Sequence, residues 1–235
     1  MKKIKIAHLY YDAMNLYGEE GNVRALEKFI SRQGITCEVH KLSIGDDIDF
    51  NAYDFYYIGC GSEDNQMLVL EDLKKYKDDI ESALKKGKMI LATGNAMELF
   101  GRKIKFKDAH SIDCLGLFDY QAVELDRRNV SEIFYKYDQL EEGKGRDILG
   151  FRNSNCNIIH NNNRMFEFPN SVNIGSFYGI DFVGPLLIRN PYFTNMLIEK
   201  LFKEKDIPYK TITDTIEFKA YREFLNNFII NSDID

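Results

Sequence analysis

Apolar runs alternate with amphipathic stretches along the first half of the chain, and this order constrains the fold more than any other feature. Two stretches, 22–33 and about 65–86, place apolar side chains three and four residues apart, which predicts helices ending near Gly34 and Gly87. Strands that alternate with helices form a parallel sheet with right-handed crossovers. The predicted strands span 4–10, 36–42, 53–59 and 88–93.

Small residues follow the third and fourth predicted strands. Gly59 and Gly61 flank the end of the third, and Gly94 and Asn95 follow the fourth. In open parallel sheets, ligands bind where the strands end at their carboxyl side. We therefore expect these two strand ends to form one binding rim.

The pattern changes after about residue 104, where short β-like runs are divided by polar turns. A helix is predicted over 191–205, with Asn190 as its N-cap before Pro191. A further amphipathic helix is predicted over 214–230. No linker is evident, so we expect one α/β domain over 1–235, with strand-rich additions and a helical tail over about 211–235.

Composition excludes several classes of function. Net charge is −6 with both signs mixed, which gives no footprint for nucleic acid. The chain has no apolar stretch of the roughly 20 residues that a membrane span needs. The cysteines are widely spaced, which favours free thiols in a reducing cytoplasm over disulfides or structural zinc. We expect no metal and no cofactor. The cysteines are Cys37, Cys60, Cys114 and Cys156.

The stretch "ILATGNAMELFG", 90–101, has the form of a strand that turns sharply into a helix. Acyl-transfer enzymes present a nucleophile at such a corner, and the amides that follow bind an anion. That chemistry needs Ser or Cys at the corner and a histidine nearby. This corner holds Thr93, Gly94 and Asn95 instead.

Five phrases together resemble the CobB/CobQ-like class I glutamine amidotransferases, and within them the glutaminase subunit of lipid II isoglutaminyl synthase. The resemblance implies a class I glutamine amidotransferase-like (flavodoxin-like) fold with a mostly parallel sheet flanked by helices. It also implies a cytoplasmic partner, a Mur-ligase-like ATP-dependent synthetase acting on cell-wall precursor. This chain has no phosphate-loop motif of its own. The phrases are 9–35, 58–66, 90–101, 149–159 and 179–191.

The resemblance places the catalytic residues of the family on positions that cannot do their chemistry. The nucleophilic cysteine falls on Gly94, the catalytic histidine on Val183, and the histidine of the family's "GFENH" phrase on Ser154. A glutaminase needs a thiolate and a base. Glycine fits a strained corner without steric penalty, so the fold survives while the chemistry is lost. We therefore expect a catalytically degenerate subunit.

Other residues carry two interpretations each. Cys60 is either a relocated nucleophile or a small buried thiol. Glu98 stands where the family more often has glutamine, although a carboxylate there also suits the helix dipole. Arg128 resembles an arginine that the family places near its glutamine pocket, and it is equally a solvated charge. Cys156 and His160 either pair across a hairpin or lie in a surface turn.

Three functions remain open at this point. The first is the degenerate subunit, which stabilises its partner or binds glutamine or a similar small amide at Gly59, Gly61, Gly94, Asn95 and Arg128. The second is an active glutaminase that uses Cys60 and supplies ammonia to that ligase or to a cobyric acid synthase-like amidation. The third is a non-enzymatic module that binds a small ligand on the same fold.

Overall fold

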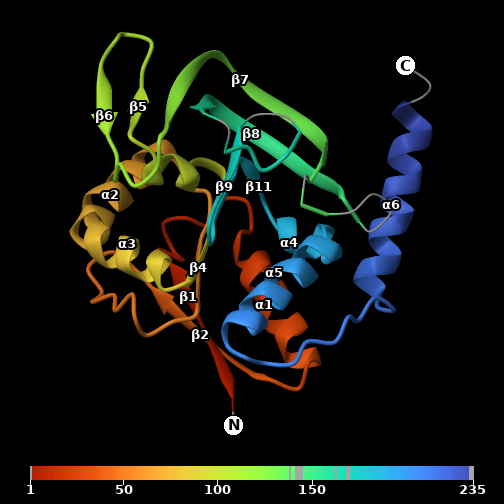
Figure 1. Ribbon diagram of the computed structural model, residues 1–235. Helices are drawn as coiled ribbons and strands as arrows, with labels where there is room; N and C mark the ends of the chain where they lie inside the picture. The colour runs from red at the N-terminus through yellow and green to blue at the C-terminus, as the bar shows by residue number, and fades with distance from the viewer. Residues whose placement is uncertain (1, 138, 141–144, 162, 168–169, 233–235) are drawn as a thin grey trace.

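A six-stranded sheet forms the centre of the protein (Figure 1). The computed structural model describes residues 2–137, 139–140, 145–161, 163–167 and 170–232. The spatial order is β2-β1-β3-β4-β10-β9, and all neighbours are parallel except β9, which runs antiparallel to β10. The mostly parallel α/β fold is therefore confirmed. The strands are β1 (Lys3–Leu9), β2 (Thr36–Leu42), β3 (Phe55–Ile58), β4 (Met89–Thr93), β9 (Ser171–Ile174) and β10 (Phe177–Ile180).

Helices cover both faces of this sheet. On one face, α1, α5 and the start of α6 bury Ile4 and Ile6 of β1 in an apolar core. On the other face, α2, α3 and the 3-10 helix η2 cover Ala7 and Leu9 (Figure 1). The alternation of buried side chains along β1 follows from the two-residue period of a strand. The helices are α1 (Glu20–Arg32), α2 (Glu63–Leu73), α3 (Lys77–Lys85), η2 (Gly94–Phe100), α4 (Leu186–Arg189), α5 (Pro191–Glu204) and α6 (Ile216–Ser232).

The helix predicted over 65–86 is interrupted. A 3-10 turn, η1 (Lys74–Tyr76), separates α2 from α3 and changes the direction of the chain. The side chain of Leu68 is 61% exposed, whereas α2 buries Val69, Leu70 and Leu73. The helix predicted at the corner after β4 forms with 3-10 geometry.

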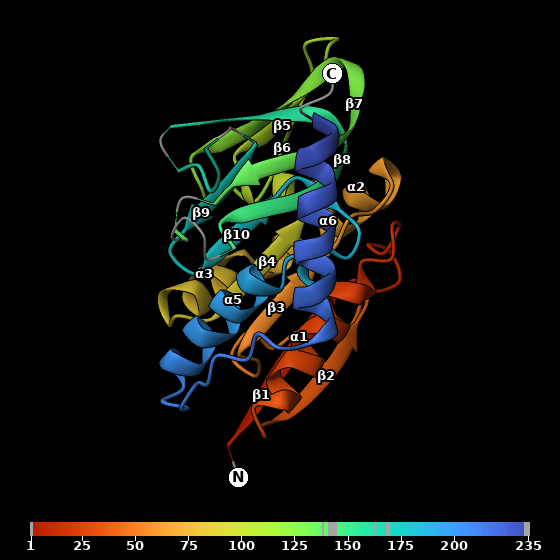
Figure 2. The same cartoon turned by 90° about the vertical axis from the view of Figure 1, so that its right-hand side faces the viewer.

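The second half builds another sheet, which lies over the carboxyl ends of the central strands (Figures 1 and 2). Its order is β11-β8-β7-β5-β6, and most of it is one long antiparallel hairpin rather than the short strands expected. The pairing of β7 with β8 shifts register between Glu124 and Asn129. The strands are β5 (Lys103–Lys105), β6 (Ser111–Asp113), β7 (Tyr120–Lys136), β8 (Asp147–His160) and β11 (Phe182–Val183).

The C-terminal helix α6 is held to α1 by charge. Glu217 in its first turn is nearly buried, and its carboxylate pairs with Lys28 at 2.8 Å and Arg32 at 3.0 Å. Asn190 holds the N-cap position of α5 as predicted, but its side chain makes no capping bond, because it bonds both backbone groups of Leu149 on β8. Within the described part of the chain, no helix is long and apolar enough to cross a membrane.

His8 lies inside β1 as a buried residue, and neither of its ring nitrogens has a hydrogen-bond partner in the described part of the chain. Its ring packs 5.4 Å from the ring of Tyr57, under the beginning of α1. Burial disfavours the charged imidazolium and lowers the pKa of His8 from 6.5 to about 4. The charges of Glu20 and Lys41 have smaller effects: Glu20 raises this pKa and Lys41 lowers it. The folded protein therefore holds His8 neutral.

We predict that His8 makes the fold sensitive to acid. The unfolded chain takes up this proton near pH 6.5 and the folded chain only near pH 4, so stability falls as pH drops through that window. The loss reaches about 3 kcal/mol, since each pKa unit corresponds to about 1.4 kcal/mol. Urea unfolding at pH 7 and pH 5 should show a smaller pH dependence for His8→Phe. The control His40→Phe changes an exposed ring on β2 and should keep the wild-type dependence. Equal dependence in both variants contradicts this account.

Candidate functional site

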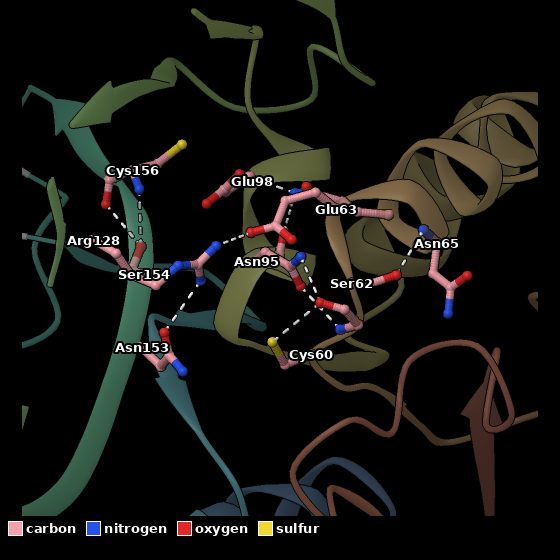
Figure 3. A network of polar contacts seen from close by, with 12 residues as sticks. Cys60, Ser62, Glu63, Asn65, Asn95, Glu98, Arg128, Asn153, Ser154 and Cys156 are labelled. Carbon is pink, nitrogen blue, oxygen red and sulfur yellow. Dashed lines mark hydrogen bonds and ion pairs between the residues drawn. The ribbon is translucent and has the colours of Figure 1, made fainter. Parts of the chain in front are cut away.

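The two strand ends predicted to form a rim do meet, and a cavity of about 180 Å³ opens beside them. The loop after β3 contributes Cys60 and Gly61, and the corner after β4 contributes Gly94 and Asn95. Arg128 lines the same cavity from the β7–β8 hairpin (Figure 3). Gly59 and Val183 lie behind these residues rather than on the cavity wall.

Position 94 has no space for a larger side chain beside Cys60, and its backbone conformation would strain one. Gly94 has φ +57°, in the left-handed region that glycine adopts most readily. An added Cβ would lie 2.6 Å from the Cβ of Cys60, 2.9 Å from its sulfur and 3.1 Å from Cγ1 of Val183. The positions that the resemblance assigns to the nucleophile and its base are therefore in contact, and both lack the chemistry.

Cys60 is poorly placed to act as a nucleophile. The side chain is 4% exposed, and burial raises the pKa of its thiol to about 12. The thiol donates to the carbonyl of Gly61 at 3.6 Å, and the backbone amide of Asn95 points at the sulfur. Among the described residues that line the cavity, none is a histidine. At neutral pH this thiol stays protonated.

The other histidines and thiols do not form a catalytic pair. Cys156 lies beside the carboxyl of Glu98 (Figure 3), and burial raises the pKa of its thiol. His160 ends the same strand, and neither of its ring nitrogens has a partner among the described residues. Both interpretations of Cys156 and His160, a pair across a hairpin or a surface turn, are therefore wrong, because both residues belong to β8 and Cys156 is buried. No cluster of three metal-ligating side chains occurs in the described ranges.

Acceptors within the protein already bond two backbone amides at the rim, those of Gly61 and Cys60. The amide of Gly61 donates to Oδ1 of Asn95 at 3.1 Å, and Nδ2 of Asn95 returns a bond to the Gly61 carbonyl at 2.9 Å. The amide of Cys60 donates to the carboxylate of Glu19. Groups of the protein itself therefore occupy these two donors, which leaves them unable to bind a ligand. Gln66 reinforces the arrangement by donating to the Asn95 carbonyl at 2.7 Å.

Glu19 joins the elements behind the rim, and sequence reasoning did not single it out. The carboxylate is fully buried and accepts from the amide of Gly184 at 2.6 Å, the hydroxyl of Tyr57 at 2.6 Å and the hydroxyl of Thr93 at 2.9 Å. Burial raises the pKa of Glu19, while these donors act to lower it. Glu19 sits in a loop without periodicity, so only its place in the resembling phrase 9–35 singled out this region.

Glu98 is a buried carboxyl, and it does not lie in the first turn of η2, so the interpretation as a partner of the helix dipole is wrong. It is 4% exposed, and Nε2 of Gln66 donates to it at 2.9 Å. Burial raises its pKa to about 7, and the nearby charges of Glu63 and Asp181 act in the same direction. Arg152 pairs with Asp181 at 2.7 Å. A group with this pKa changes its protonation near neutral pH, close behind the cavity.

Arg128 is not simply a solvated charge. Its guanidinium forms an ion pair with Glu63 of α2 and donates to Oδ1 of Asn153 at 3.1 Å (Figure 3). Asn153 in turn donates to the hydroxyl of Tyr17 at 2.6 Å. A cation, an anion and neutral hydrogen-bonding groups therefore face one cavity, which suits a small zwitterion.

We predict that Glu19→Gln costs about 3 kcal/mol of unfolding free energy. One carboxylate oxygen becomes an NH₂ group that faces donors, which leaves buried polar groups unpaired. Chemical denaturation measures the loss. Glu20→Gln is the matched control, because Glu20 makes only partly exposed ion pairs with Arg24 and Lys41, so it should change stability by less than about 1 kcal/mol. Similar losses in both variants would show that the buried carboxylate does not hold the rim together.

The sequence is similar to two curated proteins over nearly its whole length. The lipid II isoglutaminyl synthase (glutamine-hydrolyzing) subunit GatD of Staphylococcus aureus (strain N315) is 26% identical over 233 residues, which cover 94% of this chain and 94% of that protein. The protein of the same name from Streptococcus pneumoniae (strain ATCC BAA-255 / R6) is 25% identical over 240 residues, covering 97% and 89%.

Solved structures support the fold alone. The structure of PurLQS from Thermotoga maritima has a TM-score of 0.57 at 13% identity, covering 86% of this chain and 97% of that one. A crystal structure of a glutamine amidotransferase has a TM-score of 0.51 at 14% identity, covering 83% and 98%.

A family model settles the resemblance inferred from the five phrases. The model of the CobB/CobQ-like glutamine amidotransferase domain matches residues 5–176, which include most of β1, all of β2, β3 and β4, and the corner at Gly94. The chain therefore belongs to the CobB/CobQ-like glutamine amidotransferase family.

Proposed function

We propose that this chain is a glutamine amidotransferase subunit that has lost hydrolysis and acts with a Mur-ligase-like, ATP-dependent synthetase in lipid II amidation. The observation that carries the loss of hydrolysis is the packing of Gly94 against Cys60 and Val183. The likeness to the two GatD subunits over almost the full chain supports the setting in lipid II amidation.

Hydrolysis of a carboxamide needs a thiolate, a base and donors for the oxyanion. The thiol beside the cavity belongs to Cys60, whose pKa of about 12 leaves very little thiolate at neutral pH. The residue that would be the base is Val183. Two amides that could stabilise an oxyanion, those of Cys60 and Gly61, already donate to Glu19 and Asn95.

Ligand binding does not need these catalytic groups, and the cavity has charged and polar side chains that can bind a ligand. A cavity of about 150 Å³ holds a molecule the size of benzene, so about 180 Å³ suits a small amino acid or amide. The carboxylate of such a ligand would bind Arg128, and its ammonium group would bind Glu63, replacing the ion pair between them. We propose glutamine or a similar small amide as the ligand.

The partner would supply the ATP-dependent activation of the carboxylate. Activation of a carboxylate for amidation needs ATP, and the sequence has no phosphate-loop motif. The subunit would stabilise the synthetase, which would use free ammonia, or report glutamine to it. We place both proteins in the cytoplasm, which is consistent with four free cysteines.

A second function is favoured by one observation. The sulfur of Cys60 lies 2.9 Å from the place where a side chain at position 94 would begin. A thiol is thus present close to the expected location of the nucleophile, and Cys60 would serve as a relocated nucleophile in an active glutaminase. The buried thiol and the absence of a histidine among the described cavity residues weigh against it.

We predict that the purified protein binds L-glutamine in isothermal titration calorimetry and releases no glutamate in a coupled assay. Arg128→Gln should weaken binding by about tenfold or more, because a charge-assisted hydrogen bond contributes about 1.5–3 kcal/mol. Arg127→Gln removes the same charge from the exposed neighbour, which does not line the cavity, and should bind as the wild type does. Equal weakening by both variants would rule out a specific role for Arg128.

Cys60→Ser separates the two functions. If glutamate is released by the wild type and the release is lost in Cys60→Ser, the relocated nucleophile is correct and the degenerate subunit is wrong. Glutamate release that persists in Cys60→Ser would point to contamination or to another nucleophile, and would equally contradict our proposal.

We also predict that the protein co-purifies with a Mur-ligase-like synthetase when both are produced together, in a stable complex on size-exclusion chromatography. The complex should amidate lipid II with ammonium chloride and ATP, and should gain nothing from glutamine. Amidation driven by glutamine would show that hydrolysis is intact, whereas failure to form a complex would favour a binding module without cell-wall function.

A further inference from the structure

Two neighbouring positions, 60 and 94, share one small volume at the rim. Gly94 has the backbone of a corner residue with no side chain, and Cys60 has a side chain in a loop flanked by Gly59 and Gly61. The 2.6 Å between the Cβ of Cys60 and a Cβ built at position 94 is shorter than real Cβ contacts allow. A side chain at either position therefore excludes one at the other.

The backbone on both sides of Cys60 is closely packed. Gly59 is confined by Glu19 and by the carbonyl of Met14, both less than 3 Å from an added Cβ. Gly61 is similarly confined by the carbonyl of Ala13, and the side chain of Asn95 bonds both of its backbone groups. The loop that carries Cys60 is thus fixed on both sides, and the clash at position 94 cannot be relieved by a shift of the loop.

The sulfur of Cys60 also occupies the position where a backbone donor would otherwise face a reacting group. The backbone amide of Asn95, the residue after the corner, points at this sulfur. In acyl-transfer enzymes the amide after the nucleophile is a common donor to the oxyanion. Here that donor faces a neutral thiol, which fills the space instead of a substrate.

We propose that Cys60 is the residue that closes the corner to a nucleophile: its side chain occupies the volume that a cysteine at position 94 would need, so the two positions are coupled and mutually exclusive. This inference rests on the proposed loss of hydrolysis. It explains why a nucleophile cannot be restored at position 94 by a single substitution there. Replacement of Gly94 by cysteine, even with a histidine at position 183, then cannot rebuild the centre while Cys60 is present.

A double-mutant cycle tests the coupling without any ligand. Gly94→Ala is measured by thermal unfolding in the wild-type background and in Cys60→Gly. The control is Gly34→Ala, since Gly34 has a similar φ of +75° but nothing within 4 Å of an added Cβ. The control should lower Tm by about 5 °C in both backgrounds, which is the cost of the left-handed backbone alone.

We expect Gly94→Ala to lower Tm at least about twice as much as the control in the wild type, and no more than the control in Cys60→Gly. If Gly94→Ala does not fold, recovery of a folded protein by Cys60→Gly is the same result. An equal loss in both backgrounds, or failure to fold in both, overturns the proposal. Because this measures stability only, its failure is distinct from detection of glutaminase activity in the wild type.

The catalytic consequence is tested by comparing two rebuilt variants. Cys60→Gly/Gly94→Cys/Val183→His should release glutamate faster than Gly94→Cys/Val183→His, because the thiol and the imidazole can face each other only when position 60 is empty. A rate in the triple variant that does not exceed the rate in the double variant overturns this consequence.

Discussion

The buried carboxylate of Glu19 is the interaction on which the rim depends. It accepts hydrogen bonds from β3 through Tyr57, from the end of β4 through Thr93, and from the chain after β11 through the amide of Gly184. A carboxylate buried without such donors would cost several kcal/mol, so each bond also holds the segment that donates it. The loop before α1, the corner at Gly94 and the second sheet are thereby fixed relative to one another.

The corner after β4 keeps the backbone form that presents a nucleophile, while glycine and valine stand at the positions that the family resemblance assigns to the nucleophile and its base. The corner after β4 retains its positive φ at Gly94, and the β3 loop stays close beside it. The chemical groups differ: a neutral thiol at Cys60, an apolar side chain at Val183, and an amide at Asn95 that bonds the loop to the corner. Such an arrangement stabilises the folded state, because these polar groups bond within the protein.

The cavity itself belongs to two sheets. The first sheet supplies the glycine-rich loop and the corner, and the β7–β8 hairpin of the second supplies Arg128 and Asn153. Arg128 lies in the segment where the pairing of β7 with β8 shifts register, between Glu124 and Asn129. Such shifts redirect side chains from the regular strand pattern, which brings the guanidinium to Glu63 across the cavity.

The sequence alone determined what periodicity and glycine placement encode: the order of strands and helices in the first half, the parallel sheet, and the meeting of the two strand ends that carry Gly61 and Gly94. Motif order indicated the family, which the family model confirms, and counting from the motif flanks places the family's nucleophile and base on Gly94 and Val183, which stays a prediction. Tertiary structure decided the rest, because contacts between positions far apart in the chain depend on how strands and loops pack. Burial of Glu98, the partners of Glu19, and the shared volume of Cys60 and Gly94, 34 residues apart, have no local signal in the sequence.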